Sequence, residues 1–409
     1  MADGGCGGAH RCGPDRGGCA DPRGGSEVTA TERQRIAVVT GSRAEFGLLA
    51  PVMRAIEAHA GLELRVIVAG AHLLAPARTG REVAAAFRVD AEVEMQMDGQ
   101  SGRAADALAL GRGVAGFARA LVEIDPDWTV VLGDRIEPMA AACAASVGGF
   151  PLAHLHGGDR AEGVADEAMR HAISKLAHLH FPATEQSRER LVRMGEDPQR
   201  VHVVGSPAMD GLADVAMMND AEAAELGDPD TVFLMHPVGA SAETEFANAS
   251  CALEALRGRR VLALAPNHDP GREGIVRAIE ESGVRIEAHL ARERFVGLLK
   301  RLSERGGLLV GNSSAGLIEA AALRVPAVNI GRRQNGRERG TNVVDVESGA
   351  SIDGVRGALE SALKIDRTGI THPFGDGRTG ERVANILAKL DKAREADARA
   401  EILRKRCTH

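Results

Sequence analysis

The residues of this chain that are best suited to chemistry lie in one segment, 154–171, with the sequence HLHGGDRAEGVADEAMRH. The segment begins at the end of the apolar run 151–155, which predicts a buried strand, and two glycines then permit a tight turn. A helix predicted from about Val164 carries Asp166 and Arg170, and because these are four residues apart they share one helix face. Imidazole, carboxylate and guanidinium groups that converge at the carboxyl end of a parallel strand could transfer protons on a bound substrate. The alternative is a polar loop that leads into a solvated helix.

Four histidines in this region form two His-x-His pairs, His154 with His156 and His178 with His180. On a strand both rings of such a pair point to one face, an arrangement that metal hydrolases use. The second pair falls where a helix is predicted to join a strand, which favours a packing role. We therefore predict no metal ion, and His156 remains a candidate acid or base near neutral pH.

The polar loops of the chain are phased with its predicted strands. Each of them follows directly on an apolar run: 41–47, 133–135, 154–159, 236–237, 266–268 and 311–314. The carboxyl ends of parallel strands meet at one edge of a sheet. The phasing therefore predicts that these loops form the two walls of one cleft.

A candidate anion site lies at 311–316, with the sequence GNSSAG. A strand is predicted to end here and a helix to begin near Ser314, where Asn312, Ser313 and Ser314 can cap it. The free N–H groups and the positive end of such a helix suit a diphosphate, although the same residues also suit an ordinary helix cap. Glu319, farther along the helix, could accept hydrogen bonds from ribose hydroxyls or simply be solvated.

Basic side chains could hold phosphates by forked hydrogen bonds. The candidates are Arg43 and the run Arg332, Arg333, Arg337 and Arg339, for which a solvated loop is the alternative. Neither a Walker A sequence nor a GxGxxG sequence occurs.

The repeated alternation of strand and helix predicts an α/β fold with parallel sheets and right-handed crossovers. The first series of predicted strands is 36–40, 64–69, 128–132, 151–155, 179–182 and 201–204. The second is 231–235, 261–265, 307–310 and 327–330. We expect two Rossmann-like, doubly wound domains that face a cleft, with boundaries at 35–207 and 208–375, a hinge at 205–230, and a last helix at 378–403 within the segment 376–409. Residues 1–34, rich in Gly, Arg and Asp, are predicted to be a disordered leader.

Composition sets limits on function. A chain of 409 residues is too long for a single hydrophobic core, which predicts two domains. Its net charge of −7 argues against a nucleic-acid-binding surface. The longest apolar stretches, such as 139–147, are too short to cross a membrane. Cys143 and Cys251 lie in apolar helical patterns and are predicted to be buried, and no disulfide framework is indicated, which fits a reducing cytoplasm.

Taken together, the motifs TGSRAEFG, LGDR, HLHGGD, ADEAMRH, PNHDPG, GNSSAGLIEA and NIGRRQNGRERGTNV resemble those of the hydrolysing UDP-N-acetylglucosamine 2-epimerases, from about Arg35 to Lys392. The resemblance implies the GT-B fold, with a C-terminal helix that crosses back to the first domain. It also implies a two-stage reaction for sialic-type sugar synthesis. UDP leaves as the C2 proton is removed, which gives 2-acetamidoglucal, and water then adds to release N-acetylmannosamine.

The resemblance also implies roles for single residues, with no metal and no cofactor. Asp134 is similar to a catalytic aspartate that acts near C2, Asp166 to a second carboxylate, and Arg170 to the charge partner of that carboxylate. The implied nucleotide contacts are Arg43, His236, Ser313 and Ser314 for the diphosphate, Glu319 for the ribose, and Asn267 near the uracil. A homodimer or homotetramer is the implied assembly.

The chain departs from the family pattern at a few positions. Some relatives carry Glu where this chain has His156, so the base that removes the C2 proton stays open. Asp159 stands where Glu is commoner, and Phe46 where Tyr is usual. An insertion at 162–163 resembles a bacterial branch that also includes enzymes acting on UDP- or GDP-2,4-diacetamido-2,4,6-trideoxyglucose.

Two further functions are compatible with this fold. A GT-B glycosyltransferase would need an acceptor groove, usually basic or aromatic, which the sequence does not show clearly. A sugar-nucleotide-binding regulator without turnover would be expected to have lost the carboxylates, yet Asp134 and Asp166 are both present. Release of free UDP without an acceptor distinguishes the epimerase from both.

Overall fold

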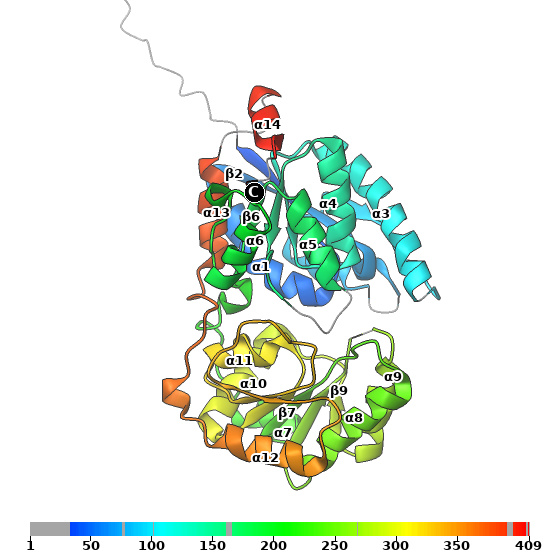
Figure 1. The fold of residues 1–409 in the computed structure, drawn as a ribbon, viewed down its shortest axis with the longest axis vertical. Coiled ribbons are helices and arrows are strands. Elements are labelled where there is room, and N and C mark those ends of the chain that lie inside the picture. The colour runs from blue at the N-terminus through cyan, green and yellow to red at the C-terminus, as the bar shows by residue number, and fades with distance from the viewer. Residues whose placement is uncertain are drawn as a thin grey trace, which may run out of the picture. The chain divides into compact units, whose positions relative to one another are not determined.

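The architecture consists of two parallel β-sheets, each with helices on both faces (Figure 1). It was obtained as a computed structural model, which describes residues 33–75, 78–100, 102–160, 166–267, 269–390, 396–405 and 408. The predicted leader therefore lies outside the described residues, except that β1 already begins at Gln34. None of the described helices combines the length and the apolar character that crossing a membrane requires.

The first sheet has the strand order β3-β2-β1-β4-β5-β6. Its strands are β1 (Gln34–Thr40), β2 (Leu62–Ala69), β3 (Ala91–Val93), β4 (Trp128–Leu132), β5 (Leu152–Leu155) and β6 (Leu179–Phe181). All neighbours pair in parallel, and Val38 lies opposite both Val66 and Val130. These central strands are continuous apolar runs because both faces of a parallel sheet are buried.

The helices of this half alternate with its strands. They are α1 (Arg43–Ala58), α2 (Gly80–Ala86), α3 (Arg103–Ile124), α4 (Ile136–Gly148), α5 (Asp166–Leu176) and α6 (Glu185–Arg193), with short 3₁₀ turns at η1 (Gly70–Leu73), η2 (Pro198–Arg200) and η3 (Pro207–Met209). Helix α1 begins five residues before the predicted position 48, since the side chain of Ser42 caps it by accepting from the N–H of Glu45.

The second sheet has the order β12-β11-β10-β7-β8-β9, again with parallel neighbours. Its strands are β7 (Thr231–Leu234), β8 (Val261–Leu264), β9 (Arg285–Glu287), β10 (Leu308–Gly311), β11 (Ala327–Ile330) and β12 (Val343–Val346). Its helices are α7 (Asp220–Glu225), α8 (Ala242–Ala255), α9 (Arg272–Ser282), α10 (Arg292–Arg305), α11 (Glu319–Ala322) and α12 (Ile352–Leu363), with 3₁₀ turns at η4 (Ser314–Gly316) and η5 (Arg367–Gly369).

The predicted fold class is confirmed, and the structure corrects three details. The run 201–204 is not a strand, because only Val201 forms a bridge, to His180. The short strands β3, β9 and β12 were missed, since they have three or four residues and carry charges. Cys143 and Cys251 are partly rather than fully buried, and the thiol of Cys251 donates to the carbonyl of Ala350 at 3.2 Å.

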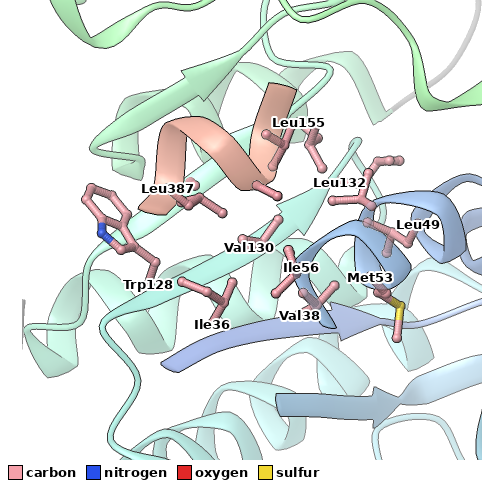
Figure 2. Close-up of a cluster of buried hydrophobic side chains, with 14 of the residues drawn as sticks. Ile36, Val38, Leu49, Met53, Ile56, Trp128, Val130, Leu132, Leu155 and Leu387 are labelled. Carbon is pink, nitrogen blue, oxygen red and sulfur yellow. The ribbon is translucent and has the colours of Figure 1, made fainter. Parts of the chain in front are cut away.

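The C-terminal segment returns to the first half of the chain. Helix α13 (Thr379–Lys389) packs against α1, and Gly380 approaches the backbone so closely that an added Cβ would lie 2.7 Å from the carbonyl oxygen of Pro51. Both carboxylate oxygens of Asp210 accept hydrogen bonds from the first N–H groups of α13, those of Thr379 (2.9 Å) and Gly380 (2.6 Å). Figure 2 shows Leu387 of α13 in the same apolar cluster as Ile36 and Val130.

The predicted single helix over 378–403 is wrong. Helix α13 ends at Lys389 because Leu390 is extended, and its carbonyl accepts a hydrogen bond from the Gln34 side chain at 2.6 Å. A separate helix, α14 (Ala396–Leu403), follows. The domain boundaries at 207/208 and 375/376 stay predictions.

The packing of α13 predicts a large effect of Leu387→Ala. Leu387 is fully buried, so the substitution leaves a cavity, and we expect the free energy of unfolding to fall by about 2–5 kcal/mol in urea titrations. Leu363→Ala is the matched control, since Leu363 is 41% exposed on α12 and should change stability by about 0.5 kcal/mol or less. Equal losses in the two variants would show that α13 does not contribute to this core.

Candidate active site

A pocket of about 190 Å³ collects several of the predicted site residues. It is lined by Leu48, Leu132, Gly133, Asp134, His156, Arg170, Ser206, Ala208, Ser314, Ile318, Glu319, Arg333, Gln334 and Arg337. Seven of these are residues that the sequence had singled out: Asp134, His156, Arg170, Ser314, Glu319, Arg333 and Arg337. The pocket is smaller than the roughly 300–1,000 Å³ that encloses a drug-sized ligand, so it suits a small group or one part of a larger ligand.

An ion pair between Asp134 and Arg170 forms part of the lining of this pocket. Strand β4 ends at Leu132, Gly133 turns with a φ of 80°, and Asp134 follows, while Arg170 comes from helix α5. The Arg170 side chain is 4% exposed. Burial, with a contribution from the nearby charge of Arg337, lowers the pKa of Arg170 to about 9, so the group is still a cation at neutral pH.

Arg170 has donors left over for a ligand. Its Nε and Nη1 atoms are buried, and neither has a hydrogen-bond partner among the described residues. Buried donors without partners are costly, and a substrate oxygen in the pocket would satisfy them. The sequence had assigned Arg170 to Asp166; the structure describes Asp166 as the first residue of α5, and its side chain lies outside the described part. That pairing therefore stays a prediction, and the contact with Asp134 was not anticipated.

His156 is held at both ring nitrogens. Its Nδ1 lies 2.7 Å from Oδ2 of Asp159, and its Nε2 lies 3.1 Å from Oγ of Ser206. The other oxygen of Asp159 accepts from the hydroxyl of Ser187 at 2.9 Å. The backbone of His156 has a φ of 62°, a left-handed conformation that is unusual for a residue with a side chain and common at functional sites.

The charge of Asp159 follows from these contacts. Burial alone would raise the pKa of its carboxyl group, but His156, Arg337 and the Ser187 hydroxyl together lower that pKa. Asp159 is therefore a carboxylate at neutral pH. As a carboxylate it can only accept a hydrogen bond, so Nδ1 of His156 carries the proton between them.

The other histidines of the two His-x-His pairs are parts of the protein interior. His154 contacts Ser174 Oγ at 3.1 Å and the carbonyl of Gly133 at 2.8 Å, and burial lowers its pKa to about 3. His178 accepts from the N–H of Leu152 at 3.2 Å, and His180 pairs with Glu196 at 2.8 Å. Within the described residues no group of three or more His, Cys, Asp or Glu side chains is placed to hold a metal ion.

Glu319 faces the pocket from the second half of the chain. Its burial raises the pKa of its carboxyl group, a shift that Arg292, Arg337 and His156 partly offset. The regular helix expected from Ser314 is instead the short 3₁₀ turn η4 followed by the four-residue helix α11. The aligned peptide dipoles expected at Ser314 are therefore fewer than predicted, and side chains must supply more of the positive potential.

Four predicted nucleotide contacts lie outside the pocket lining. Nδ1 of His236 accepts from the N–H of Asn267 at 3.2 Å, and burial, together with Arg333, lowers the pKa of His236 to about 3, so the ring is neutral and its Nε2–H is a donor. Ser313 caps the turn η4 by accepting from the N–H of Ala315 at 3.4 Å. Arg43 pairs with Glu82 at 3.3 Å.

The predicted basic run 332–339 divides into two groups. Arg333 and Arg337 line the pocket, whereas Arg332 pairs with Glu347 and Arg339 with Asp345.

Two polar pocket residues were missed, Ser206 and Gln334. Gln334 is buried and donates to the carbonyl of Asn312 at 2.9 Å. Ser206 lies two residues after the apolar run 201–204, and Gln334 lies within the basic run 332–339. A search for polar residues just after those runs could have found them.

A pair of buried carboxyl groups supports the same edge of the first sheet. Glu45 accepts from the N–H of Gly41 at 2.8 Å, and Glu137 accepts from the side chain of Gln96 at 2.8 Å. Glu137 lies so close to Gly41 that an added Cβ there would be 2.4 Å from its Cβ. Burial, with the nearby negative charge of Glu137, raises the pKa of Glu45 to about 8, so Glu45 is mostly protonated at neutral pH.

Comparison with known proteins places the chain in a family. Residues 54–388 match the family model of UDP-N-acetylglucosamine 2-epimerases. The chain is 35% identical to a hydrolysing UDP-N,N′-diacetylbacillosamine 2-epimerase of Legionella pneumophila over 87% of its length and 96% of that protein. It is 33% identical to a UDP-N-acetylglucosamine 2-epimerase of Neisseria meningitidis over 87% of its length and 95% of that protein. The chain belongs to the UDP-N-acetylglucosamine 2-epimerase family, which is a family of enzymes.

Solved structures agree with this assignment at the level of the fold. The Methanocaldococcus jannaschii UDP-GlcNAc 2-epimerase, crystallised with UDP-GlcNAc and UDP, superposes with a TM-score of 0.71 at 19% identity, covering 87% of this chain and 99% of that one. The Neisseria meningitidis enzyme bound to UDP-GlcNAc gives a TM-score of 0.70 at 17% identity, covering 87% of this chain and 100% of that one. The predicted GT-B architecture is thereby confirmed.

The raised pKa of Glu45 predicts a pH-dependent effect of Glu45→Gln. Between about pH 4.5 and 8 the folded chain keeps a proton on Glu45 that the unfolded chain has released, so this group makes folding less favourable as the pH rises. Glutamine removes that penalty, which is at most about 1.4 kcal/mol per pH unit. The free energy of unfolding of the variant, relative to that of the wild type, should therefore increase with pH up to about pH 8 and stay constant above it.

Urea unfolding at a series of pH values measures this difference. Glu57→Gln is the matched control, because Glu57 is exposed on the same helix. A difference between Glu45→Gln and the wild type that does not change with pH would contradict a protonated Glu45.

Proposed function

We propose that this protein is a hydrolysing 2-epimerase of a nucleotide-linked 2-acetamido sugar, which releases UDP and the C2 epimer of the free sugar. The observation that carries the proposal is the ion pair between Asp134 and the buried Arg170, which shares one pocket with His156 and Glu319 in a chain of the 2-epimerase family. The named relatives of Legionella pneumophila and Campylobacter jejuni are hydrolysing 2-epimerases, which supports the hydrolytic outcome.

The first stage is an elimination. Asp134, paired with Arg170, takes the proton from C2, the C–H electron pair forms the C1=C2 bond, and the C1–O bond breaks with its electrons on the diphosphate. The C2 proton is barely acidic, so the leaving group must carry much of the charge early, and cations near it lower the barrier. The proposed diphosphate contacts are Arg333, Arg337 and Ser314 in the pocket lining, with Arg43, His236 and Ser313 outside it.

The second stage is the hydration of the 2-acetamidoglucal. Water adds to C1, and C2 receives a proton on the face opposite to the one that lost it, which inverts C2. A second carboxyl group must supply that proton, and we propose Asp166 for this role. The free donors of Arg170 would hold an oxygen of the acetamido sugar, Glu319 would accept from the ribose, and Asn267 would lie near the uracil. The reaction balances with water alone and involves no redox step.

Two sugars are candidates. UDP-N-acetylglucosamine would give N-acetylmannosamine. The apolar part of the pocket wall, formed by Leu48, Leu132 and Ile318, favours the second candidate, UDP- or GDP-2,4-diacetamido-2,4,6-trideoxyglucose, because that sugar carries a methyl group at C6 and a second acetamido group. The Legionella relative is named for this same sugar, N,N′-diacetylbacillosamine.

Assembly and location are part of the proposal. We propose a homodimer or homotetramer, as the sequence resemblance implies, acting in the reducing cytoplasm that the scattered cysteines indicate. A GT-B glycosyltransferase remains the alternative, and it would retain UDP-sugar in the absence of an acceptor.

Proton NMR in deuterated water tests the function. The purified protein is incubated with each of the three sugar nucleotides, and we expect one of them to yield free nucleoside diphosphate and a 2-epimer that carries deuterium at C2. Deuterium at C2 reports proton removal, and the free sugar reports hydrolysis. Product without deuterium at C2, or no nucleotide release from any of the three without an acceptor, would refute the proposal.

The role of Asp134 is tested by Asp134→Asn. An amide cannot take the C2 proton, so we expect kcat to fall by at least about a hundredfold while the circular dichroism spectrum stays unchanged. Asp214→Asn, at an exposed position, is the control for the substitution. A kcat within about threefold of the wild type would remove Asp134 from the mechanism.

A further inference from the structure

The hydrogen bonds of His156 raise a question about how it could act on a substrate. Both ring nitrogens are occupied, Nδ1 by Asp159 at 2.7 Å and Nε2 by Ser206 at 3.1 Å. The ring therefore has no nitrogen that is open to the pocket. Any proton that His156 exchanges with a ligand must pass through Ser206, which also lines the pocket.

The direction of the Ser206 hydrogen bond follows from its neighbours. Because Asp159 is a carboxylate, Nδ1 of His156 donates to it, and in the neutral ring Nε2 is an acceptor. The hydroxyl oxygen of Ser206 already accepts from the N–H of Ala208 at 3.3 Å, and its proton is left to donate to Nε2. The result is a serine–histidine–aspartate chain in which the hydroxyl is polarised by the imidazole.

The position of Ser206 is fixed by the fold. Its N–H donates to the carbonyl of Phe374 at 2.9 Å, and it begins the 3₁₀ turn η3. The residue is fully buried and also lines the pocket. Its burial leaves no room for a large substrate group at the hydroxyl, which argues against attack by Ser206 on the sugar.

We propose that Ser206, backed by His156 and Asp159, activates the water that adds to C1 in the hydration stage. This inference rests on the proposed function. As the water oxygen forms its bond to C1, its proton passes to Ser206 Oγ and the hydroxyl proton of Ser206 passes to Nε2 of His156. The electrons of the C1=C2 bond take up the proton that the second carboxyl group delivers to C2. His156 then returns its proton through Ser206 to a water molecule in the pocket, and solvent reprotonates the second carboxyl group.

A purely structural role is the competing explanation, because Ser206 also caps the turn η3. The two roles differ in which stage they affect. Loss of a cap would disturb the pocket and slow elimination and hydration together. Loss of water activation would leave elimination in place and allow the 2-acetamidoglucal to accumulate.

The experiment compares Ser206→Ala with the wild type on the sugar nucleotide that the wild type turns over, and follows UDP release and the sugar product by NMR. We expect Ser206→Ala to release UDP at a rate within about tenfold of the wild type. Its conversion of added 2-acetamidoglucal to the 2-epimer should fall by about a hundredfold or more, in line with typical proton-transfer contributions. Ser206→Thr keeps the hydroxyl and should restore part of the hydration.

Two further variants sharpen the result. The double variant Ser206→Ala/His156→Ala should hydrate no more slowly than the slower single variant, because the two residues act as a unit. Ser351→Ala, which removes the exposed cap of α12, is the control for the loss of a serine cap and should leave both stages unchanged.

The outcomes separate cleanly. Equal loss of both stages in Ser206→Ala, or hydration at the wild-type rate, would overturn the role of Ser206. Absence of UDP release from the wild type with every sugar nucleotide would instead overturn the proposed function itself.

Discussion

The candidate site depends on a buried guanidinium that is satisfied by one carboxylate. Taking Arg170 out of water costs several kcal/mol, and Asp134 offsets that cost only because strand β4 and helix α5 bring the two groups into contact. Losing Asp134 would leave the buried guanidinium of Arg170 without its charge partner, and breaking a buried pair in this way typically costs about 3–5 kcal/mol. The same pair leaves the Nε and Nη1 donors of Arg170 without a partner among the described residues. One contact, between Asp134 and Arg170, therefore both stabilises the buried guanidinium and positions the carboxylate for the proposed chemistry.

A second set of contacts fixes the turn at 156–159 that faces this pair. The guanidinium of Arg190 donates to the carbonyl of Gly158 at 3.0 Å and pairs with Glu338 at 2.9 Å. Glu338 is buried and directly follows Arg337, a pocket residue of the second half of the chain. The left-handed backbone of His156 is thus held by side chains from several elements, as a strained functional position requires.

The parts of this arrangement that could be predicted from the sequence are those set by local patterns. Continuous apolar runs such as 128–132 and 151–155 specify buried parallel strands, and the polar residues just after them, Asp134 and His156, fall at one sheet edge by geometry alone. The edge strands β3, β9 and β12 are short and carry charges, so they form by pairing with a neighbour rather than from their own pattern. The contacts of Ser206 with His156 and Phe374 join residues 50 or more positions apart, which periodicity does not reveal.

The pocket contains two sets of interacting polar side chains, the Asp134–Arg170 pair and the Ser206–His156–Asp159 chain, and their charges suit two successive reactions. The Asp134–Arg170 pair is a fixed negative charge beside a fixed positive charge, which favours removing a proton from carbon while a diphosphate departs. In the Ser206–His156–Asp159 chain the hydroxyl of Ser206 is neutral, and the negative charge lies on the carboxylate of Asp159. This arrangement favours the transfer of a proton between oxygen atoms. A non-hydrolysing epimerase must return UDP to C1 and gains nothing from an activated water. In the proposed mechanism, the neutral relay through Ser206 is therefore the feature that commits the glycal to hydrolysis.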